Sequence, residues 1–270
     1  MKNILVVITT AFVPTGGLTT VMMNYYRMMN KEEVKIDFAS TNNPPQVLLD
    51  EIHASGSEYY QLPDRKNVLA YFFALKKLCR GYDAIHVHAN SAMAVMELQA
   101  AIWAGIKIRI IHNHSSRSQH NLLNQLFLSL YRRSFTQAVA CSDEAGEWLY
   151  GKNGFITLRN AINAKRFKFD VVKRLIMRHN FGFGDDEYVI GHIGKFMEAK
   201  NHSFLIEVFA KYHALQPKSK LLLIGDGELR HLVEAAIDKN KVNDCVILAG
   251  LRSDIPDVLL AIDIFLFPLK

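Results

Sequence analysis

The chain of 270 residues is 50% hydrophobic and 21% charged, a balance that is typical of folded globular proteins and excludes an intrinsically disordered chain. No apolar run reaches the roughly 18 residues of a membrane-spanning helix, and three scattered cysteines without metal-ligand spacing suit a reducing cytosol. The net charge of +6 is uneven, because residues 1–168 contain 19 lysines and arginines against 12 acidic residues. A basic first half without nucleic-acid-binding signatures predicts an anionic membrane surface or a phosphate-bearing acceptor as partner, and no nucleic acid.

Short β-rich apolar runs alternate with longer stretches of helical periodicity, and this alternation predicts right-handed βαβ units around a parallel sheet. The first run is expected to be a buried strand and not a signal peptide, since no small-x-small cleavage site follows it. In the first half, the predicted strands are residues 3–9, 34–40, 83–89, 107–113, 137–142 and 155–160, and the predicted helices are residues 17–30, 67–80, 92–105, 120–135 and 143–151.

A charged stretch that ends in "FGFGDDE" interrupts the alternation, which resumes at Tyr188. We therefore predict an α/β protein with two Rossmann-like domains, residues 1–168 and a partial second domain of residues 188–270, joined by a linker of residues 169–187. In the second domain, the predicted strands are residues 188–194, 220–225, 245–250 and 263–268, and the predicted helices are residues 203–215, 228–237 and 254–261.

The stretch "GHIGKFMEAKNH" carries two lysines, Lys195 and Lys200, between a buried strand and the next helix. Ligands of α/β proteins bind at the carboxyl ends of parallel strands, and the start of a helix attracts anions. These lysines are therefore candidates for binding a diphosphate. The alternative is that both are solvated loop lysines.

Two pairs of glycines follow strands in the same way. Gly225 and Gly227 match the opening of a dinucleotide fingerprint, but Arg230 fills its third glycine position, so a tight turn is an equal alternative. Gly16 and Gly17 precede the first helix, where glycine allows positive φ and lets a phosphate or sugar reach backbone amides.

Two histidine pairs, His86 with His88 and His112 with His114, each occupy positions i and i+2 of a strand and so share a face. A zinc site is conceivable, but no third ligand of suitable spacing joins either pair, and burial with a backbone hydrogen bond is the ordinary alternative. The apolar stripe of residues 122–131, which ends at Arg132 and Arg133, is expected to face the core more than a membrane.

The chain resembles a family. In order and spacing, it is similar to the GT-B glycosyltransferases of family 4, the retaining "group 1" enzymes, and above all to those that build exopolysaccharide and capsule. The stretches that carry the resemblance are "PTGGLTTVMMNYY", "DAIHVHAN", "RIIHNHSSRS", "AVACSDEAGEWLYG", "LRNAIN", "GKFMEAKNHSFLIEVFA", "LLLIGDGEL" and "VILAGLRSDIPDVLLAIDIFLFP".

The resemblance implies a retaining hexosyltransferase that takes a UDP-linked sugar to a lipid-linked glycan, in the cytosol at the inner face of the membrane, without cofactor or metal. It implies that Lys195 and Lys200 hold the donor diphosphate and stabilise the leaving group. It further implies that His114 lies by the transferred sugar, as the catalytic residue. Donor binding is also assigned to the loops of Gly16, Gly17, Gly225 and Gly227.

The sequence departs from the family pattern at several points. Lys195 stands where arginine is usual, so a bidentate fork is lost, and Ala161 after Asn160 replaces the glycine of an "NG" turn. The chain ends at Lys270, before the family's Glu-(seven residues)-Glu signature, so a truncated chain is expected. The alternatives left open are an inactive remnant that at most binds nucleotide or a partner, a nucleotide-sugar epimerase and, least favoured, an NAD-linked dehydrogenase.

Overall fold

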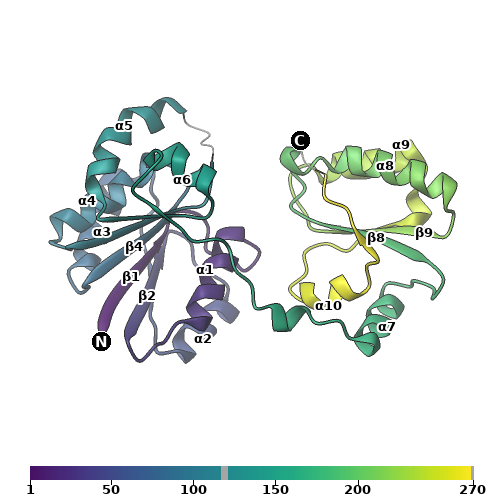
Figure 1. The fold of residues 1–270 in the computed structure, drawn as a ribbon, viewed down its shortest axis with the longest axis horizontal. Helices are drawn as coiled ribbons and strands as arrows, with labels where there is room; N and C mark the ends of the chain where they lie inside the picture. The colour runs from purple at the N-terminus through teal and green to yellow at the C-terminus, as the bar shows by residue number, and fades with distance from the viewer. Residues whose placement is uncertain (117–120, 269–270) are drawn as a thin grey trace. The chain divides into compact units, whose positions relative to one another are not determined.

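The computed structural model describes residues 1–116 and 121–268, which divide into two compact units, Met1–Ile162 (unit 1) and Asn163–Lys270 (unit 2) (Figure 1). Each unit has its own parallel β-sheet with helices on both faces, so the predicted α/β class with two Rossmann-like domains is confirmed. Within the described residues, no helix is long and apolar enough to cross a membrane.

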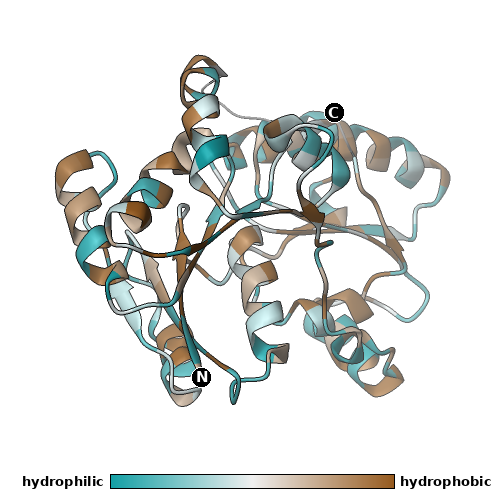
Figure 2. Cartoon of the chain, turned by 60° about the vertical axis from the view of Figure 1, so that its left-hand side comes forward, coloured by the Kyte–Doolittle hydropathy of each residue, from teal (hydrophilic) through white to brown (hydrophobic). Residues whose placement is uncertain are grey.

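Unit 1 is built on a parallel sheet of seven strands, counted over the described residues, in the order β3-β2-β1-β4-β5-β6-β7. Strand β1 is hydrophobic on both faces, as a parallel strand covered on both sides requires, and Figure 2 colours much of the sheet as hydrophobic. The strands are β1 Lys2–Ile8, β2 Val34–Ser40, β3 Tyr59–Gln61, β4 Ala84–Ala89, β5 Ile108–Asn113, β6 Gln137–Ala140 and β7 Ile156–Thr157.

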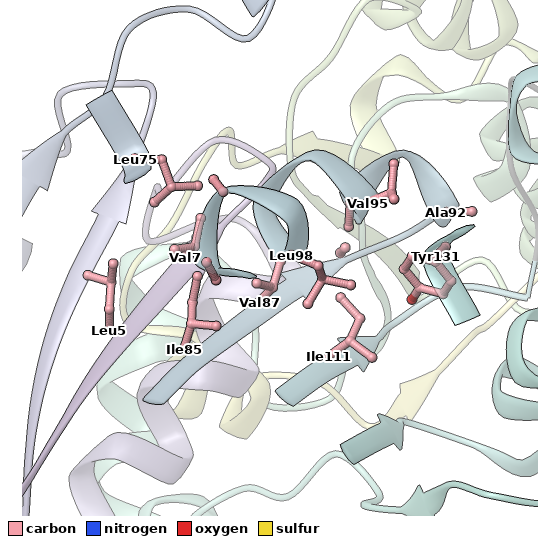
Figure 3. Packing of buried hydrophobic residues seen from close by; sticks show 14 of the residues in the cluster. Leu5, Val7, Leu75, Ile85, Val87, Ala92, Val95, Leu98, Ile111 and Tyr131 are labelled. Carbon is pink, nitrogen blue, oxygen red and sulfur yellow. The ribbon is translucent and has the colours of Figure 1, made fainter. Parts of the chain in front are cut away.

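Alternate residues of β1 divide the core of unit 1 into two layers. Leu5 and Val7 pack with α3, α4, α5 and α6 (Figure 3), whereas Val6 and Ile8 pack on the opposite face with α1 and α2. The helices of unit 1 are α1 Gly17–Met28, α2 Gln46–Ala54, α3 Val68–Cys79, the 3₁₀ turn η1 Ala92–Ala94, α4 Val95–Trp103, α5 Asn121–Ser134 and α6 Asp143–Tyr150.

Unit 2 has a parallel sheet of four strands in its described part, in the order β10-β9-β8-β11. Its helices α8 and α9 pack on one face, and α7 and α10 on the other. The elements are η2 Ala164–Phe167, α7 Val171–Asn180, β8 Tyr188–Ile193, η3 Glu198–Lys200, α8 His202–Leu215, β9 Ser219–Ile224, α9 Arg230–Asn240, η4 Asn243–Cys245, β10 Val246–Leu248, α10 Ile255–Leu260 and β11 Ile264–Phe265.

Helix α7 lies inside the segment predicted to be a linker, residues 169–187. The side chain of Asp170 caps the helix by accepting from the Lys173 amide at 3.0 Å. Arg178 is buried and donates to the carbonyls of Gly184 and Glu187, so the charged residues that suggested a linker anchor this helix. The compact units divide at residues 162 and 163 instead.

The sequence patterns also passed over α2 and β3. Helix α2 begins after Pro45, and β3 has only three residues, which is too short for a periodic signal. The predicted helix of residues 203–215 corresponds closely to α8, which begins one residue earlier.

Candidate functional site

The turn from β8 to α8 brings both predicted lysines beside Gly194. Lys195 follows this glycine in the chain, and its Nζ forms an exposed ion pair with Glu228 Oε1 at 3.0 Å. The stem of Lys200 packs over Gly194, where an added Cβ would lie 3.4 Å from Lys200 Cγ. Its Nζ lies 4.9 Å from the centre of the Phe267 ring. The lysines therefore flank one point at the carboxyl end of β8.

Helix α8 begins directly after these lysines. Asn201 takes the left-handed conformation, with φ of +45°, which turns the chain from η3 into the helix. Its side chain does not cap the helix. The start of this fourteen-residue helix can therefore attract an anion through its first amides and its partial positive charge.

Gly225 and Gly227 are explained by the contact between two loops. A Cβ on Gly225 would lie 2.0 Å from the Gly194 carbonyl oxygen, and one on Gly227 would lie 2.5 Å from that of Phe196. Gly225 also has a φ of +141°. The glycines thus let the β9–α9 turn press against the lysine-bearing turn, which favours the tight-turn interpretation.

Two histidines that the sequence reasoning did not single out lie beneath Lys200. The ring of His192 on β8 packs 5.0 Å from that of His202, and its Nδ1 lies 2.9 Å from the Leu266 carbonyl oxygen. Burial, with a smaller contribution from the neighbouring His192 and Lys200, lowers the pKa of His202 to about 4. The pattern "GHIG…KNH" carried this signal, since its histidines border the lysine turn.

Gly16 and Gly17 lie at the start of α1, after β1, as predicted. Gly16 is the N-cap with φ of −76°, and neither glycine has a positive φ, so the conformational freedom that glycine allows is not used here. A Cβ on Gly17 would meet no described atom within 4 Å, so the described part of the chain leaves the space beside it open. On the same helix α1, the side chain of Asn24 donates a hydrogen bond to the backbone carbonyl of Ala161 at 3.1 Å.

The four histidines of the two pairs form one row on β4 and β5. Their strands pair in parallel with His88 opposite His112, so all four rings share a face of the sheet. The ring centres of His86 and His88 are 4.2 Å apart, as are those of His112 and His114. His88 Nδ1 and His114 Nε2 lie 2.9 Å apart, within hydrogen-bonding distance.

Burial makes this row electrically neutral at pH 7. Loss of hydration lowers the pKa of His86 and of His114 to about 4, and that of His112 to about 2, with mutual repulsion adding to the shift for His86 and His112. His114, at the partly exposed end of the row, can therefore accept or donate a hydrogen bond without carrying charge.

Taken together, each unit presents polar groups and a helix start at the carboxyl ends of its strands. Unit 2 offers two cations and a helix start for an anion, and unit 1 offers His114 and the open start of α1. A hollow of about 650 Å³ lies at the opposite, amino ends of β1 and β2, and is lined by Lys35, Asp37 and Tyr82 among others. Because ligands of parallel sheets bind at carboxyl ends, we do not assign it the site.

Comparison with known proteins agrees with both units. The model of the family "Glycosyltransferase Family 4" matches residues 15–172, and that of "Glycosyl transferases group 1" matches residues 173–270. The chain is 28% identical to the putative glycosyltransferase EpsF of Bacillus subtilis, over 94% of this chain and 70% of that protein.

Two further likenesses extend the comparison. The chain is 22% identical to the Escherichia coli enzyme UDP-Gal:alpha-D-GlcNAc-diphosphoundecaprenol alpha-1,3-galactosyltransferase, over 94% of this chain and 70% of that enzyme. The crystal structure of HepE from Anabaena, in complex with UDP and glucose, has the same fold, with a TM-score of 0.83 and 17% identity over 100% of this chain and 74% of that one. The chain therefore belongs to Glycosyltransferase Family 4, whose model matches more than half of it, with a second part that matches the group 1 glycosyl transferases, and it is an α/β transferase by family.

Proposed function

We propose that this chain transfers a hexose from a UDP-linked donor to a lipid-linked glycan, with retention of anomeric configuration, during the synthesis of a cell-surface polysaccharide. The observation that carries the proposal is the pair Lys195 and Lys200 on the turn before the uncapped start of α8. Two cations and a helix start form a site for a diphosphate, whose negative charge grows as it leaves the sugar.

Neutralisation of the leaving group is the chemical core of the proposed mechanism. Lys195 exchanges its ion pair with Glu228 for a phosphate oxygen, at little cost because that pair is exposed. Lys200 is held by its stem on Gly194 and over Phe267, so its ammonium group is already positioned. The acceptor hydroxyl then attacks on the face that the diphosphate leaves and gives its proton to the departing phosphate oxygen, which retains the configuration.

His114 is proposed to contact the transferred sugar. Its hydrogen bond with His88 fixes the ring, and burial keeps it uncharged. A neutral imidazole can orient a sugar hydroxyl without opposing the positive charge that develops on the anomeric carbon. Gly16 and Gly17 are proposed to admit the donor at the open start of α1.

A lipid-linked acceptor and work at the inner membrane face are supported by the surface of unit 1. Helix α5 exposes Leu122 and Leu126, which are 84% and 71% accessible, and ends in Arg132 and Arg133. Of the relatives, the Escherichia coli enzyme is named for a diphosphoundecaprenol-linked substrate. An apolar stripe beside basic residues matches an anionic bilayer surface.

Nucleotide titration tests the donor site. Calorimetry of the 270-residue chain with UDP, GDP and ADP should detect saturable binding of UDP. A charged hydrogen bond contributes about 1.5–3 kcal/mol, so Lys195→Ala with Lys200→Ala should weaken UDP binding on the order of 100-fold or more. The matched control removes the exposed helix lysines Lys211 and Lys239 and should leave the affinity unchanged.

The transfer itself is tested with UDP-sugars and a polyprenyl-diphosphate-linked acceptor, and the anomeric configuration of the product is read by NMR. UDP binding without transfer would support the alternative, a remnant that binds nucleotide only. Failure of the folded chain to bind any nucleotide would remove the support for a donor site in unit 2.

A further inference from the structure

The row of histidines on β4 and β5 has more polar groups than partners. His112 is 1% exposed, and neither Nδ1 nor Nε2 of its ring has a hydrogen-bond partner among the described residues. The buried Nε2 of His86 also has no hydrogen-bond partner among the described residues. An imidazole left in this state costs free energy, because a neutral ring has one donor and one acceptor that water would otherwise satisfy.

Among the described residues, the strand next to β4 offers the row no polar side chain to fill this need. On the strand next to β4, Val6 is opposite His86 and Ile8 is opposite His88. Both are buried apolar residues of the layer that α1 and α2 cover. On the same face of the sheet, β4 and β5 carry imidazole rings beside this apolar layer. Because some nitrogens of these rings have no partner in the described part of the chain, we infer that they bind another group.

We propose that His86, His88 and His112 form a binding site for one divalent transition-metal ion of the zinc class. One ring nitrogen from each of the three residues lies within 4.8 Å of the other two. In a tetrahedral zinc site with bonds of 2.0–2.1 Å, ligand nitrogens are about 3.4 Å apart. The rings of His86 and His112 are stacked with 2° between their planes, so they must turn about their broad terminal torsion before their nitrogens can converge on one ion.

His114 occupies the position of an outer partner in this site. Metal-bound histidines almost always donate their second ring nitrogen to an acceptor, which fixes the tautomer. His88 has such an acceptor in His114 Nε2, at 2.9 Å from its Nδ1, which leaves His88 Nε2 for the ion. The ion would then tie β4 to β5 directly beneath the residue proposed to contact the sugar.

The ligand type selects the ion. Among the described residues, no carboxylate or cysteine joins the three imidazoles. Imidazole ligands suit zinc, copper and nickel, whereas magnesium and calcium require oxygen. Three ligands leave a fourth position open, and the proposed site is separate from the lysines that take the donor diphosphate in unit 2.

Metal titration of the full chain, without a polyhistidine tag and freed of metal with EDTA, tests the proposal. Calorimetry with Zn²⁺ at pH 7.5 should give one ion per chain, and Co²⁺ should produce the visible absorption of a tetrahedral site. Long-range ¹⁵N spectra of the histidine rings should show shifts at three rings on addition of Zn²⁺. Mg²⁺ should produce neither effect.

Substitutions assign the ligands. His86→Gln removes a partly exposed ligand and His112→Asn a buried one, and each should lower zinc affinity at least tenfold, as should His114→Asn through the outer partner. His231→Gln, on the exposed face of α9, should change nothing. If His112→Asn fails to fold, His86→Gln and the ring spectra of the unsubstituted chain decide.

Three outcomes would overturn the proposal. The first is that the folded chain binds no stoichiometric Zn²⁺. The second is that His86→Gln binds as tightly as the unsubstituted chain. The third is that His231→Gln abolishes binding, since the ion would then be held at the surface of unit 2.

Discussion

At the scale of single residues, the glycines of the candidate site differ in whether the neighbouring chain leaves room for a Cβ. Gly225 and Gly227 are required because backbone atoms of the neighbouring turn occupy the place of a Cβ. Gly17 has open space there instead. A glycine in a strand-to-helix turn can thus serve loop packing or ligand access, and only the neighbouring chain distinguishes the two.

Gly225→Ala should destabilise unit 2 by about 2 kcal/mol or more, because a Cβ would meet the Gly194 carbonyl and the φ of +141° is strained for alanine. Urea unfolding monitored by circular dichroism measures the loss. In the control, Gly184→Ala, the Cβ would come no closer than 3.4 Å to its neighbours, the side chains of Asp186 and Glu187, and should change stability little. Equal effects of the two substitutions would contradict the packing explanation.

Acidification should weaken unit 1 through its histidine row. Burial lowers the pKa of His86 and His114 to about 4, whereas an unfolded histidine titrates near 6.5. Between these values the unfolded chain binds more protons, so stability is complete above pH 6.5 and falls as the pH decreases toward 4. In EDTA, each of these two histidines should lower the free energy of unfolding by about 2 kcal/mol from pH 7.5 to 5, so together they should lower it by about 4 kcal/mol.

The exposed His231 provides the comparison for this experiment, since His231→Gln should keep the full pH dependence. His86→Gln should reduce the slope of stability against pH. Identical free energies of unfolding at both pH values would show that the row is not buried in neutral form.

At the scale of elements, helix α5 illustrates the limit of a periodic pattern. The apolar stripe of residues 122–131 was expected to face the core. Tyr131 is buried there and Phe127 packs against the core, but Leu122, Leu126 and Leu130 are exposed. The helix is therefore apolar on two sides, and one of them is free to meet a surface.

Leu122→Ser with Leu126→Ser should reduce binding of the chain to vesicles of anionic phospholipid, because each leucine that enters the bilayer contributes up to about 1.5–3 kcal/mol. Vesicle co-sedimentation measures the bound fraction. The matched control replaces two exposed leucines of unit 2, Leu215 and Leu232, by serine. Equal binding by both variants would argue against α5 as the membrane contact.

In helix α7, by contrast, charged residues hold the helix in place through their contacts with Asp263. Asp263 accepts from the Val189 amide at 2.7 Å and from Arg178 at 3.2 Å, and Arg174 donates to it at 2.5 Å. Burial alone would raise the pKa of the Asp263 carboxyl, but these hydrogen bonds and the two guanidinium groups outweigh it and lower the pKa. The carboxylate thus joins α7 to β8 in its charged form.

At the scale of the whole molecule, the hydrophobic cores divide with the units. Two clusters of buried residues lie entirely in unit 1 and two in unit 2, as far as the described residues extend. No cluster spans the division at residues 162 and 163 in that part of the chain. Each unit therefore has the core of a separate folding domain.

Calorimetric unfolding should accordingly resolve two transitions. Asp263→Asn leaves Arg178 buried without its counter-charge, so it should cost unit 2 about 3 kcal/mol and lower one transition temperature only. Asp186→Asn, which removes an exposed ion pair with Lys218, should have little effect. A single transition that moves as a whole with Asp263→Asn would indicate one cooperative unit.

The two sheets, the family and the place of the lysines could be predicted from the sequence, because each depends on residues that are close together in the chain. The alternation of apolar runs predicted the two parallel sheets, and the motif order predicted the family. Lys195 and Lys200 could be placed at a strand end without a structure, since a strand and the turn after it are contiguous in the chain. Short elements such as β3, and α7 with its dispersed charges, gave too weak a pattern.

What only the tertiary structure decided depends on contacts between segments that are distant in the sequence. His112 becomes a neighbour of His86 and His88 because β5 pairs with β4 in one register, a relation that the spacing along the chain does not contain. Gly225 is required by the backbone of Gly194, and the charges of α7 by Asp263. Periodicity determines which face of an element is apolar, whereas the pairing of elements determines which polar groups meet.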